Sequence, residues 1–233
     1  MRWPLALVAL VAACGSCADD APEDGGPGGG SCTAAPAPAS GEGTYYDATG
    51  AGACGFEASP NDLMVAAINK PDWAMSAWCG GCVEVTGPSG TVTVRIVDQC
   101  PGCASGDLDL SREAFAKISP LAAGRVAITW TQVACPVAGP IAYHFKDGAN
   151  AFWTAIQVRN HRYPIATLEA QKDGAYVAIP RVDYNYFVQT SGLGAGPYTL
   201  RVTDTRGHVL EDTNVALGDN VTRTGAAQLP SCP

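Results

Sequence analysis

Apolar and polar residues alternate along most of this chain, and the alternation predicts many short β-strands. The clearest is the β-branched segment 91–98, which has a period of two and runs into a loop rich in Gly, Pro and Cys. Further strands are expected at residues 43–47, 82–86 and 125–133. In the last of these, Val126, Ile128 and Trp130 fall on one face, as an inward-facing set does.

Two short helices are expected among these strands. Ser59 has the position of a helix cap, with Pro60 in the first turn and Asp62 reaching back, which predicts a helix over residues 59–68. A second capped helix is expected over residues 111–118.

Beyond Gly139-Pro140 the chain alternates almost without a helical pattern. Strands recur roughly every 8–15 residues, and turns rich in Gly and Asp separate them. The expected inward-facing sets are Ile141, Tyr143 and Phe145, then Ile156 and Val158, then Tyr198, Leu200 and Val202. This spacing is typical of a β-sandwich.

The patterns divide the chain into four parts and predict an all-β protein. Residues 1–13 are an export signal, and residues 14–40 are a tether rich in Gly, Pro and acidic residues that cannot bury a core. Residues 41–137 combine short strands and brief helices, which favours a small β-barrel. Residues 138–233 form the sandwich.

The export signal consists of Arg2 and an apolar run that is too short to span a bilayer. The small residues before Cys14 resemble a bacterial lipobox, which predicts lipidation at Cys14. The alternative is an ordinary secretory signal with an Ala-rich cleavage site. We therefore expect a secreted, extracellular protein that meets a membrane only through such a lipid anchor, at the cell surface or the outer membrane.

The balance of 22 acidic and 14 basic residues gives a formal charge of −8. Neither half of the chain is basic, which excludes nucleic acid as a partner. The negative charge also disfavours tight electrostatic binding to anionic polymers.

Ten cysteines in an exported chain predict disulfides. Cys79 and Cys82, together with Cys100 and Cys103, also have the spacing of a four-thiolate zinc ribbon, but an oxidising compartment favours disulfides over zinc. The three histidines lie in separate strands or turns, at His144, His161 and His208. No metal site and no cofactor are expected.

Two carboxylates, Asp98 and Asp109, flank one tight loop that joins strand ends. Polar side chains at such ends can converge on a ligand. The alternative interpretation is structural: Asp98 caps a turn, and Asp109 precedes the helix cap.

Over residues 41–221 the chain resembles a bacterial two-domain expansin. The resemblance rests on the runs 43–46, 85–88, 97–98, 108–111, 146–148, 153–161, 163–164, 183–185 and 203–204, of which 155–161 is the specific part. It implies a six-stranded double-psi β-barrel followed by an immunoglobulin-like β-sandwich, and a monomer without a cofactor.

The resemblance also implies a function. Expansins bind cellulose and other plant cell-wall glucans and loosen plant walls without hydrolysis, so the chain is not expected to be an enzyme. Two alternatives stay open. One is a glycan-cleaving enzyme, endoglucanase-like or a lytic transglycosylase acting on peptidoglycan, with Asp109 as the acid. An endoglucanase needs a base as well, and Asp47 lies one residue from the required register. The other is a pure carbohydrate-binding protein.

Particular positions take their expected roles from the resemblance. Thr44, Tyr46, Asp98 and Asp109 match the barrel groove, and Asp109 matches the residue most needed for loosening. Cys100 stands where relatives often carry an aromatic side chain, so the groove loses one sugar-stacking ring.

In the sandwich, the cellulose-binding aromatics fall at Phe152, Trp153 and Tyr184, with Lys146 nearby. Strand alternation raises a difficulty here, because Phe152 is in phase with the inward-facing Ile156 whereas Trp153 is not. Phe152 is therefore also a candidate core residue, unless a bulge intervenes or the strand begins only after Trp153.

Cysteine-bearing relatives imply a disulfide framework. The implied pairs are Cys54–Cys79 and Cys82–Cys135, which leave Cys100–Cys103 and then Cys32–Cys232.

Overall fold

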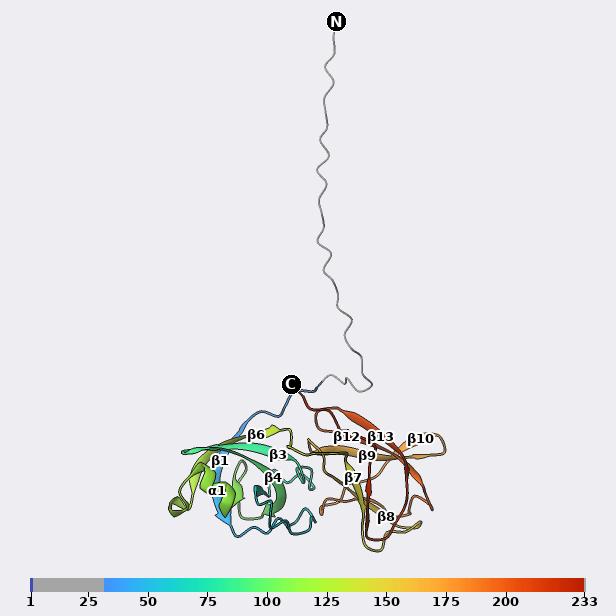
Figure 1. The fold of residues 1–233 in the computed structure, drawn as a ribbon, viewed down its shortest axis with the longest axis horizontal. Helices are drawn as coiled ribbons and strands as arrows, with labels where there is room; N and C mark the ends of the chain where they lie inside the picture. The colour runs from blue at the N-terminus through green and yellow to red at the C-terminus, as the bar shows by residue number, and fades with distance from the viewer. Residues whose placement is uncertain (2–31, 233) are drawn as a thin grey trace.

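The computed structural model describes residue 1 and residues 32–232. The described chain folds into two β-rich domains that lie side by side (Figure 1). Between Cys32 and Cys232 it contains one α-helix, α1 (Arg112–Ile118), and one short 3₁₀ helix, η1 (Leu121–Ala123). No described helix is long and apolar enough to cross a membrane.

Six strands of the first domain close into a barrel in the order β1-β5-β2-β4-β3-β6. Their bounds are β1 (Ala39–Tyr46), β2 (Val65–Asn69), β3 (Cys82–Gly87), β4 (Gly90–Cys100), β5 (Leu108–Ser111) and β6 (Val126–Val133). The pairs β1–β5 and β2–β4 are parallel, whereas the other neighbours run antiparallel. This is the six-stranded barrel that the resemblance implies, and it confirms the small β-barrel favoured by the strand pattern.

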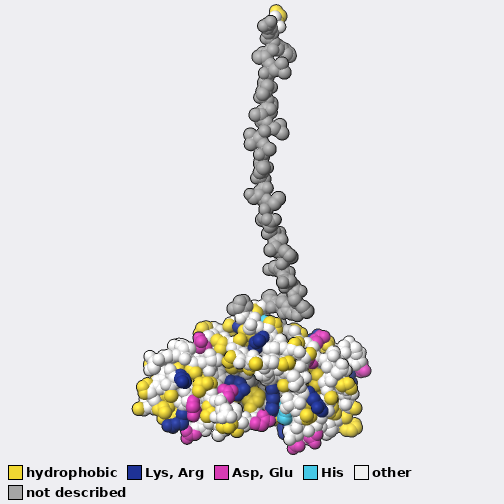
Figure 2. Space-filling view, viewed as in Figure 1, with side chains coloured by type: hydrophobic (Ala, Val, Ile, Leu, Met, Phe, Trp, Pro, Cys, Tyr) yellow, Lys and Arg dark blue, Asp and Glu magenta, His cyan; other side chains and the backbone are white. Residues whose placement is uncertain are grey.

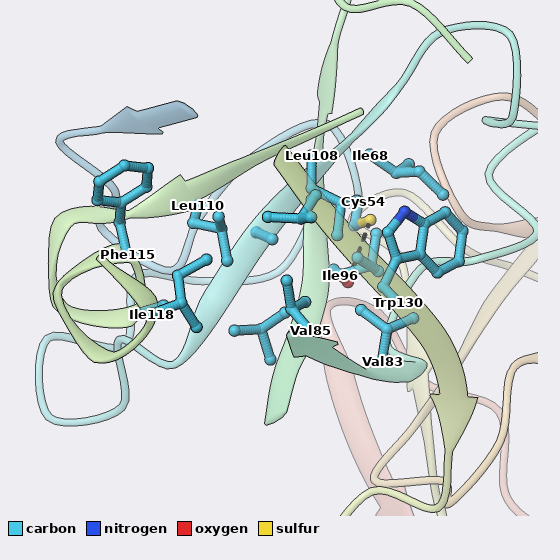
Figure 3. Packing of buried hydrophobic residues seen from close by; sticks show 14 of the residues in the cluster. Cys54, Ile68, Val83, Val85, Ile96, Leu108, Leu110, Phe115, Ile118 and Trp130 are labelled. Carbon is cyan, nitrogen blue, oxygen red and sulfur yellow. Dashed lines mark hydrogen bonds between the residues drawn. The ribbon is translucent and has the colours of Figure 1, made fainter. Parts of the chain in front are cut away.

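The interior of the barrel is filled by apolar side chains from all six strands and from α1. Figure 3 shows Phe115 and Ile118 of α1 at one end of this cluster and Trp130 of β6 at the other. Ser111 caps α1, because its Oγ accepts a hydrogen bond from Ala114 N at 3.0 Å. The helix predicted over residues 111–118 is thus confirmed, with Ser111 as its cap.

The helix predicted over residues 59–68 is wrong. Residues 65–69 form β2, which is buried along its whole length between β4 and β5. A strand that is covered on both faces has a continuous apolar run instead of an alternating one, and such a run does not distinguish a strand from a buried helix. Ser59 and Asp62 form a tight turn, with Asp62 N donating to Ser59 O at 2.9 Å.

The second domain is a sandwich of two four-stranded sheets, ordered β10-β9-β12-β13 and β11-β8-β7-β14. Their bounds are β7 (Ala142–Phe145), β8 (Thr154–Arg159), β9 (Ile165–Lys172), β10 (Ala175–Ala178), β11 (Phe187–Gln189), β12 (Tyr198–Asp204), β13 (Val209–Val215) and β14 (Val221–Thr224). The inward-facing sets expected from alternation all belong to one buried cluster between these sheets. The predicted sandwich is confirmed.

Four disulfides link described cysteines: Cys32–Cys232, Cys54–Cys79, Cys82–Cys135 and Cys100–Cys103. These are the pairs that the resemblance implies.

The tether expected over residues 14–40 is wrong for its last part. Cys32 is bonded to Cys232 at the other end of the chain, and Thr33 N donates to Arg206 O at 2.9 Å. Figure 1 shows the start of the described chain beside the C-terminus, and β1 begins before residue 40. The candidate lipidation site, Cys14, and the export signal lie outside the described residues, apart from Met1.

Candidate functional site

The barrel brings three polar side chains of the predicted groove into one row across its strands. Asp98 on β4 is opposite Ala67 of β2, Ala67 is opposite Asp109 of β5, and Asp109 is opposite Thr44 of β1. The two aspartates are therefore two strand spacings apart, about 10 Å between Cα atoms. The Asp109 side chain points away from the barrel interior, because its neighbours Leu108 and Leu110 belong to the core. Asp98 follows a register shift between β2 and β4 and is half-buried.

Asp98 is held in place by the loop that follows β1. Its Oδ1 accepts hydrogen bonds from Ala53 N at 2.7 Å and from its neighbour Gln99 N at 2.8 Å. Gly52 makes this approach possible, because a Cβ there would lie 2.4 Å from Asp98 Cγ. The loop thus holds the Asp98 carboxylate through the backbone N–H of Ala53.

Asp109 is half-buried and accepts a hydrogen bond from Thr44 Oγ1 at 2.6 Å. Burial raises the pKa of Asp109 above its usual value, and the nearby Asp98 raises it further, while the Thr44 hydrogen bond lowers it. Burial and the same two carboxylates raise the pKa of Tyr46, whose buried hydroxyl has no hydrogen-bond partner among the described residues. The hydroxyl is a free donor beside two carboxylates.

Asp47, the candidate base, is exposed in the loop after β1. Its carboxylate faces the first residue of α1, with Oδ1 lying 3.7 Å from Arg112 Nε. The Asp47–Arg112 pair thus lies at the start of α1, where the Arg112 guanidinium also lies 5.0 Å from the centroid of the Tyr45 ring. None of the contacts of Asp47 joins it to Asp109.

The sandwich exposes the predicted aromatic side chains at one surface. Phe152 has 83% of its surface exposed and Tyr184 has 44%, whereas Trp153 is half-buried against Ala155 and Tyr186. The alternative placement of Phe152 in the core is wrong. β8 begins only at Thr154, and the turn before it lets both neighbouring rings avoid the interior.

Tyr186, which the sequence analysis missed, is buried at 6% exposure and supports this surface from within the domain. Its ring centroid is 5.8 Å from that of Tyr184, and Lys146 Nζ lies 6.0 Å from the Tyr186 centroid. Strand alternation gave no signal for Tyr186, since residues 183–185 form a turn in which Asn185 has a positive φ of 63°. We call Phe152, Trp153 and Tyr184, together with the buried Tyr186 that packs against Tyr184, the ring platform.

A short chain of contacts links the groove to the ring platform. Cys54 O accepts hydrogen bonds from Gln157 Nε2 at 2.9 Å and from Asn185 Nδ2 at 3.1 Å. Cys54 directly follows Ala53, which binds Asp98, and Asn185 lies between the two platform tyrosines. The same loop therefore contacts Asp98 at one end and Asn185, the chain neighbour of Tyr184 and Tyr186, at the other.

Three further hydrogen bonds join the two domains beside this loop. Trp73 Nε1 donates to Asp183 Oδ1 at 2.7 Å, and Ser76 Oγ donates to Val182 O at 2.9 Å. Asn185 N donates to the same Ser76 Oγ at 3.0 Å. Trp73 and Ser76 are almost fully buried, so their donors are satisfied by the sandwich domain.

A cavity of about 310 Å³ also lies between the domains, and its lining includes Arg95, Arg159 and His161. Basic side chains gather where the two domains meet in the view of Figure 2. Arg159 binds both carboxylate oxygens of Glu57, and Arg95 binds Asp62, so acidic partners offset both cations. Burial lowers the pKa of His161 to about 4.

Comparisons with known proteins found a matching family model and similar sequences. A family model described as lytic transglycolase matches residues 39–130, which include the barrel groove. Expansin-YoaJ of Bacillus subtilis (strain 168) is 41% identical over 177 residues, covering 72% of this chain and 76% of that protein.

Two solved structures match the whole described fold. The apo form of a Clavibacter michiganensis expansin superposes with a TM-score of 0.77 at 33% identity, covering 84% of this chain and 100% of that one. A mutant of that expansin in complex with cellohexaose gives a TM-score of 0.78 at 32% identity, with the same coverage.

Proposed function

The chain belongs to the expansin family, of the bacterial two-domain type, and on this basis we propose that it loosens plant cell walls without hydrolysing them. Its substrate in this proposal is cellulose, and other glucans of the wall are secondary partners. The complex of the Clavibacter expansin with cellohexaose supports a cellulose-like ligand.

The observation that carries the proposal is the contact chain through the loop of residues 52–54. Asp98 is bound at one end of this loop, and Asn185, between two platform tyrosines, is bound at the other. A glucan chain resting on the rings is thereby directed towards the acidic groove.

The ring platform supplies the adhesion. A ring face that covers roughly 80 Å² of sugar contributes about 2 kcal/mol at 25 cal/mol/Å². Two or three such faces, less the cost of association, give affinities in the micromolar range. Lys146 lies over the Tyr186 ring and places a donor at the edge of the surface.

The groove supplies the loosening. Asp98, Asp109 and Thr44 present oxygens that accept or donate hydrogen bonds to sugar hydroxyls. Those bonds compete with contacts between neighbouring glucans, and no covalent bond breaks. Binding and loosening are thus assigned to different surfaces.

Two variants test this division of labour. Asp109→Asn is expected to abolish creep of a plant wall strip while cellulose binding stays near the wild-type level. Trp153→Ala is expected to weaken cellulose binding by about 2 kcal/mol, roughly 30-fold, because one ring face is lost. Binding isotherms on cellulose and extension of clamped wall strips supply the two readouts. If both variants lose only binding, the assignment of roles is wrong.

A glycan-cleaving enzyme is a second candidate function. The raised pKa of Asp109 suits a general acid, and the family model that matches the barrel is described as lytic transglycolase. A transglycosylase needs only one acidic side chain, because the sugar supplies its own nucleophile. Soluble sugars assayed from the same incubations with cellulose and with peptidoglycan separate the classes. Release that disappears in Asp109→Asn favours the enzyme, and binding without creep favours a pure binding protein.

We further propose an extracellular location, as expected for an expansin, with lipid attachment at Cys14 as its anchor. Mass spectrometry of the membrane fraction, comparing wild type with Cys14→Ala, tests this part independently.

A further inference from the structure

A compact cluster of sulfur and nitrogen atoms joins the two ends of the described chain. Cys32 and Cys232 are bonded to each other, and His208 Nε2 lies 3.3 Å from Cys32 Sγ and 3.7 Å from Cys232 Sγ. His208 comes from the turn between β12 and β13, and it is 2% exposed. Neither the ring platform nor the groove includes any of these residues.

Asp204 orients the imidazole of His208. Asp204 Oδ2 is 2.8 Å from His208 Nδ1, and its Oδ1 accepts the backbone N–H groups of Arg206 and His208 at 2.8 and 2.9 Å. A carboxylate with these partners is held as an acceptor, so it places a proton on Nδ1. In the neutral ring the lone pair of Nε2 is then directed at the two sulfur atoms.

The sulfur atoms of a disulfide carry no proton to donate to that lone pair. The buried Nε2 acceptor therefore faces two atoms that cannot satisfy it. A histidine that binds a metal through one ring nitrogen usually donates its other ring N–H to a carboxylate. His208 has this arrangement, with Asp204 at Nδ1 and the lone pair of Nε2 left to bind a metal.

We propose that Cys32, Cys232 and His208 form a binding site for a soft divalent cation, such as Zn²⁺, that is closed by the disulfide and opens when it is reduced. With bonds of about 2.3 Å to sulfur and 2.05 Å to nitrogen, a tetrahedral zinc site has sulfur–nitrogen edges of about 3.6 Å. The two observed distances of 3.3 and 3.7 Å bracket that value. Only the two sulfurs have to separate for the cation to enter.

The conversion needs a dithiol as reductant. Two electrons and two protons pass from the dithiol to the bridge, which leaves two cysteine thiols and a new disulfide in the reductant. Binding of the cation then displaces both thiol protons, while His208 binds through a lone pair and releases none. Cys32 and Cys232 are half-buried, so a small dithiol can reach them.

The fourth coordination position is left to solvent. Three protein ligands and one open position allow a cation to exchange, in contrast to a closed four-thiolate site. The consequence is that the two chain ends stay joined in both states, by a covalent bond under oxidising conditions and by coordination under reducing conditions.

Sequence spacing could not suggest this site. Cys32 and His208 are 176 residues apart, and the metal patterns that can be read from sequence have ligands a few residues apart. The sequence predicted no metal site, and this proposal departs from that prediction.

Cobalt titration of the reduced full-length protein tests the proposal, because thiolate-bound Co²⁺ absorbs in the near ultraviolet and visible range. All proteins carry Cys100→Ser and Cys103→Ser, which removes one C-x-x-C pair that could compete for metal after reduction, and all keep the second such pair, Cys79 and Cys82. The variants are His208→Gln and the matched control His144→Gln, a sandwich histidine whose Nδ1 binds Thr222. Cysteines elsewhere contribute equally to every protein.

The reduced parent and His144→Gln are expected to bind one more equivalent of Co²⁺ than His208→Gln does. Asp204→Asn is expected to bind about 10–100-fold more weakly than the parent. The oxidised parent is expected to lack the additional equivalent. Equal stoichiometry and spectra in the reduced parent and His208→Gln would overturn the proposal.

A second measurement guards against misfolding. Zn²⁺ is expected to raise the unfolding temperature of the reduced parent and to leave that of reduced His208→Gln unchanged. The oxidised His208→Gln protein should unfold cooperatively, which shows that the substitution preserves the fold. A reduced parent that loses its fold and is not restored by Zn²⁺ also overturns the proposal.

Discussion

At the scale of single residues, the groove places a carboxylate where its charge is unfavourable. Asp109 is half-buried, and the Thr44 hydroxyl donates to it at 2.6 Å. Burial and Asp98 nevertheless raise its pKa. The folded chain thus holds this proton more tightly than the unfolded chain does, so stability contributed by the protonated form is lost as the pH rises through the folded pKa.

Asp109→Asn is therefore expected to stabilise the fold at neutral pH. Asparagine keeps the Oδ1 acceptor for Thr44 and removes the charge. Thermal unfolding at several pH values should show a higher midpoint for the variant near pH 7, with the difference shrinking at acidic pH where wild-type Asp109 is protonated. A variant that is less stable than wild type at neutral pH would show that Asp109 is not strained by its burial.

Gly52 sets the position of the other groove carboxylate. In Gly52→Ala, the new Cβ would lie 2.4 Å from Asp98 Cγ and 2.7 Å from Val97 O, so the loop or Asp98 must move. We expect wall creep to fall sharply, cellulose binding to persist, and stability to drop by about 1–3 kcal/mol. Gly102→Ala is the matched control, since nothing lies within 4 Å of its added Cβ. Equal creep in both variants would contradict the role of the loop.

At the scale of elements, alternation predicted the strands with one covered face and failed where both faces are covered. β6 and β12 alternate as expected, whereas β2 is buried at all five positions and was predicted as a helix. Alternation also failed to place Phe152, which it put on the same face as the inward-facing Ile156. Phase is counted from the first residue of a strand, and the sequence does not mark that β8 starts at Thr154.

The turn before β8 is what presents the platform rings, and Asn150 holds it. Its Oδ1 accepts hydrogen bonds from Phe152 N at 2.8 Å and Trp153 N at 3.1 Å. Asn150→Ala removes both acceptors, and we expect cellulose binding to weaken by about 1 kcal/mol, roughly fivefold. Asn150→Asp retains an acceptor oxygen and is expected to recover most of the affinity. Equal binding by the alanine and aspartate variants would mean that the turn does not orient the rings.

At the scale of the whole molecule, the sequence predicted two domains but not how they contact each other. The loop that joins the groove to the platform, the Trp73–Asp183 hydrogen bond and the Cys32–His208 contact all link residues more than 100 positions apart. Local patterns carry no information about such pairs. The resemblance supplied the framework of disulfides and site positions that periodicity alone did not.

His161 makes the junction between the domains sensitive to acid. Its Nδ1 lies 2.7 Å from Tyr163 O, and its Nε2 would be 2.7 Å from a Cβ added to Gly80 of the barrel, so the imidazole is packed between both domains. Burial lowers its pKa from 6.5 to about 4, while the Tyr163 hydrogen bond raises it and the charges of Arg181 and Arg95 lower it further.

As the pH falls, His161 therefore takes up a proton at a higher pH in the unfolded chain than in the folded chain. Stability from the neutral imidazole is complete above pH 6.5 and falls as the pH drops towards 4, by at most about 3 kcal/mol. We expect His161→Gln to lack this part of the acid dependence. Urea unfolding of both proteins between pH 7.5 and pH 4 gives the difference curve, from which the titration of shared carboxylates cancels. Parallel curves over that range would show that His161 is solvated, and the junction would then hold equally well in acid.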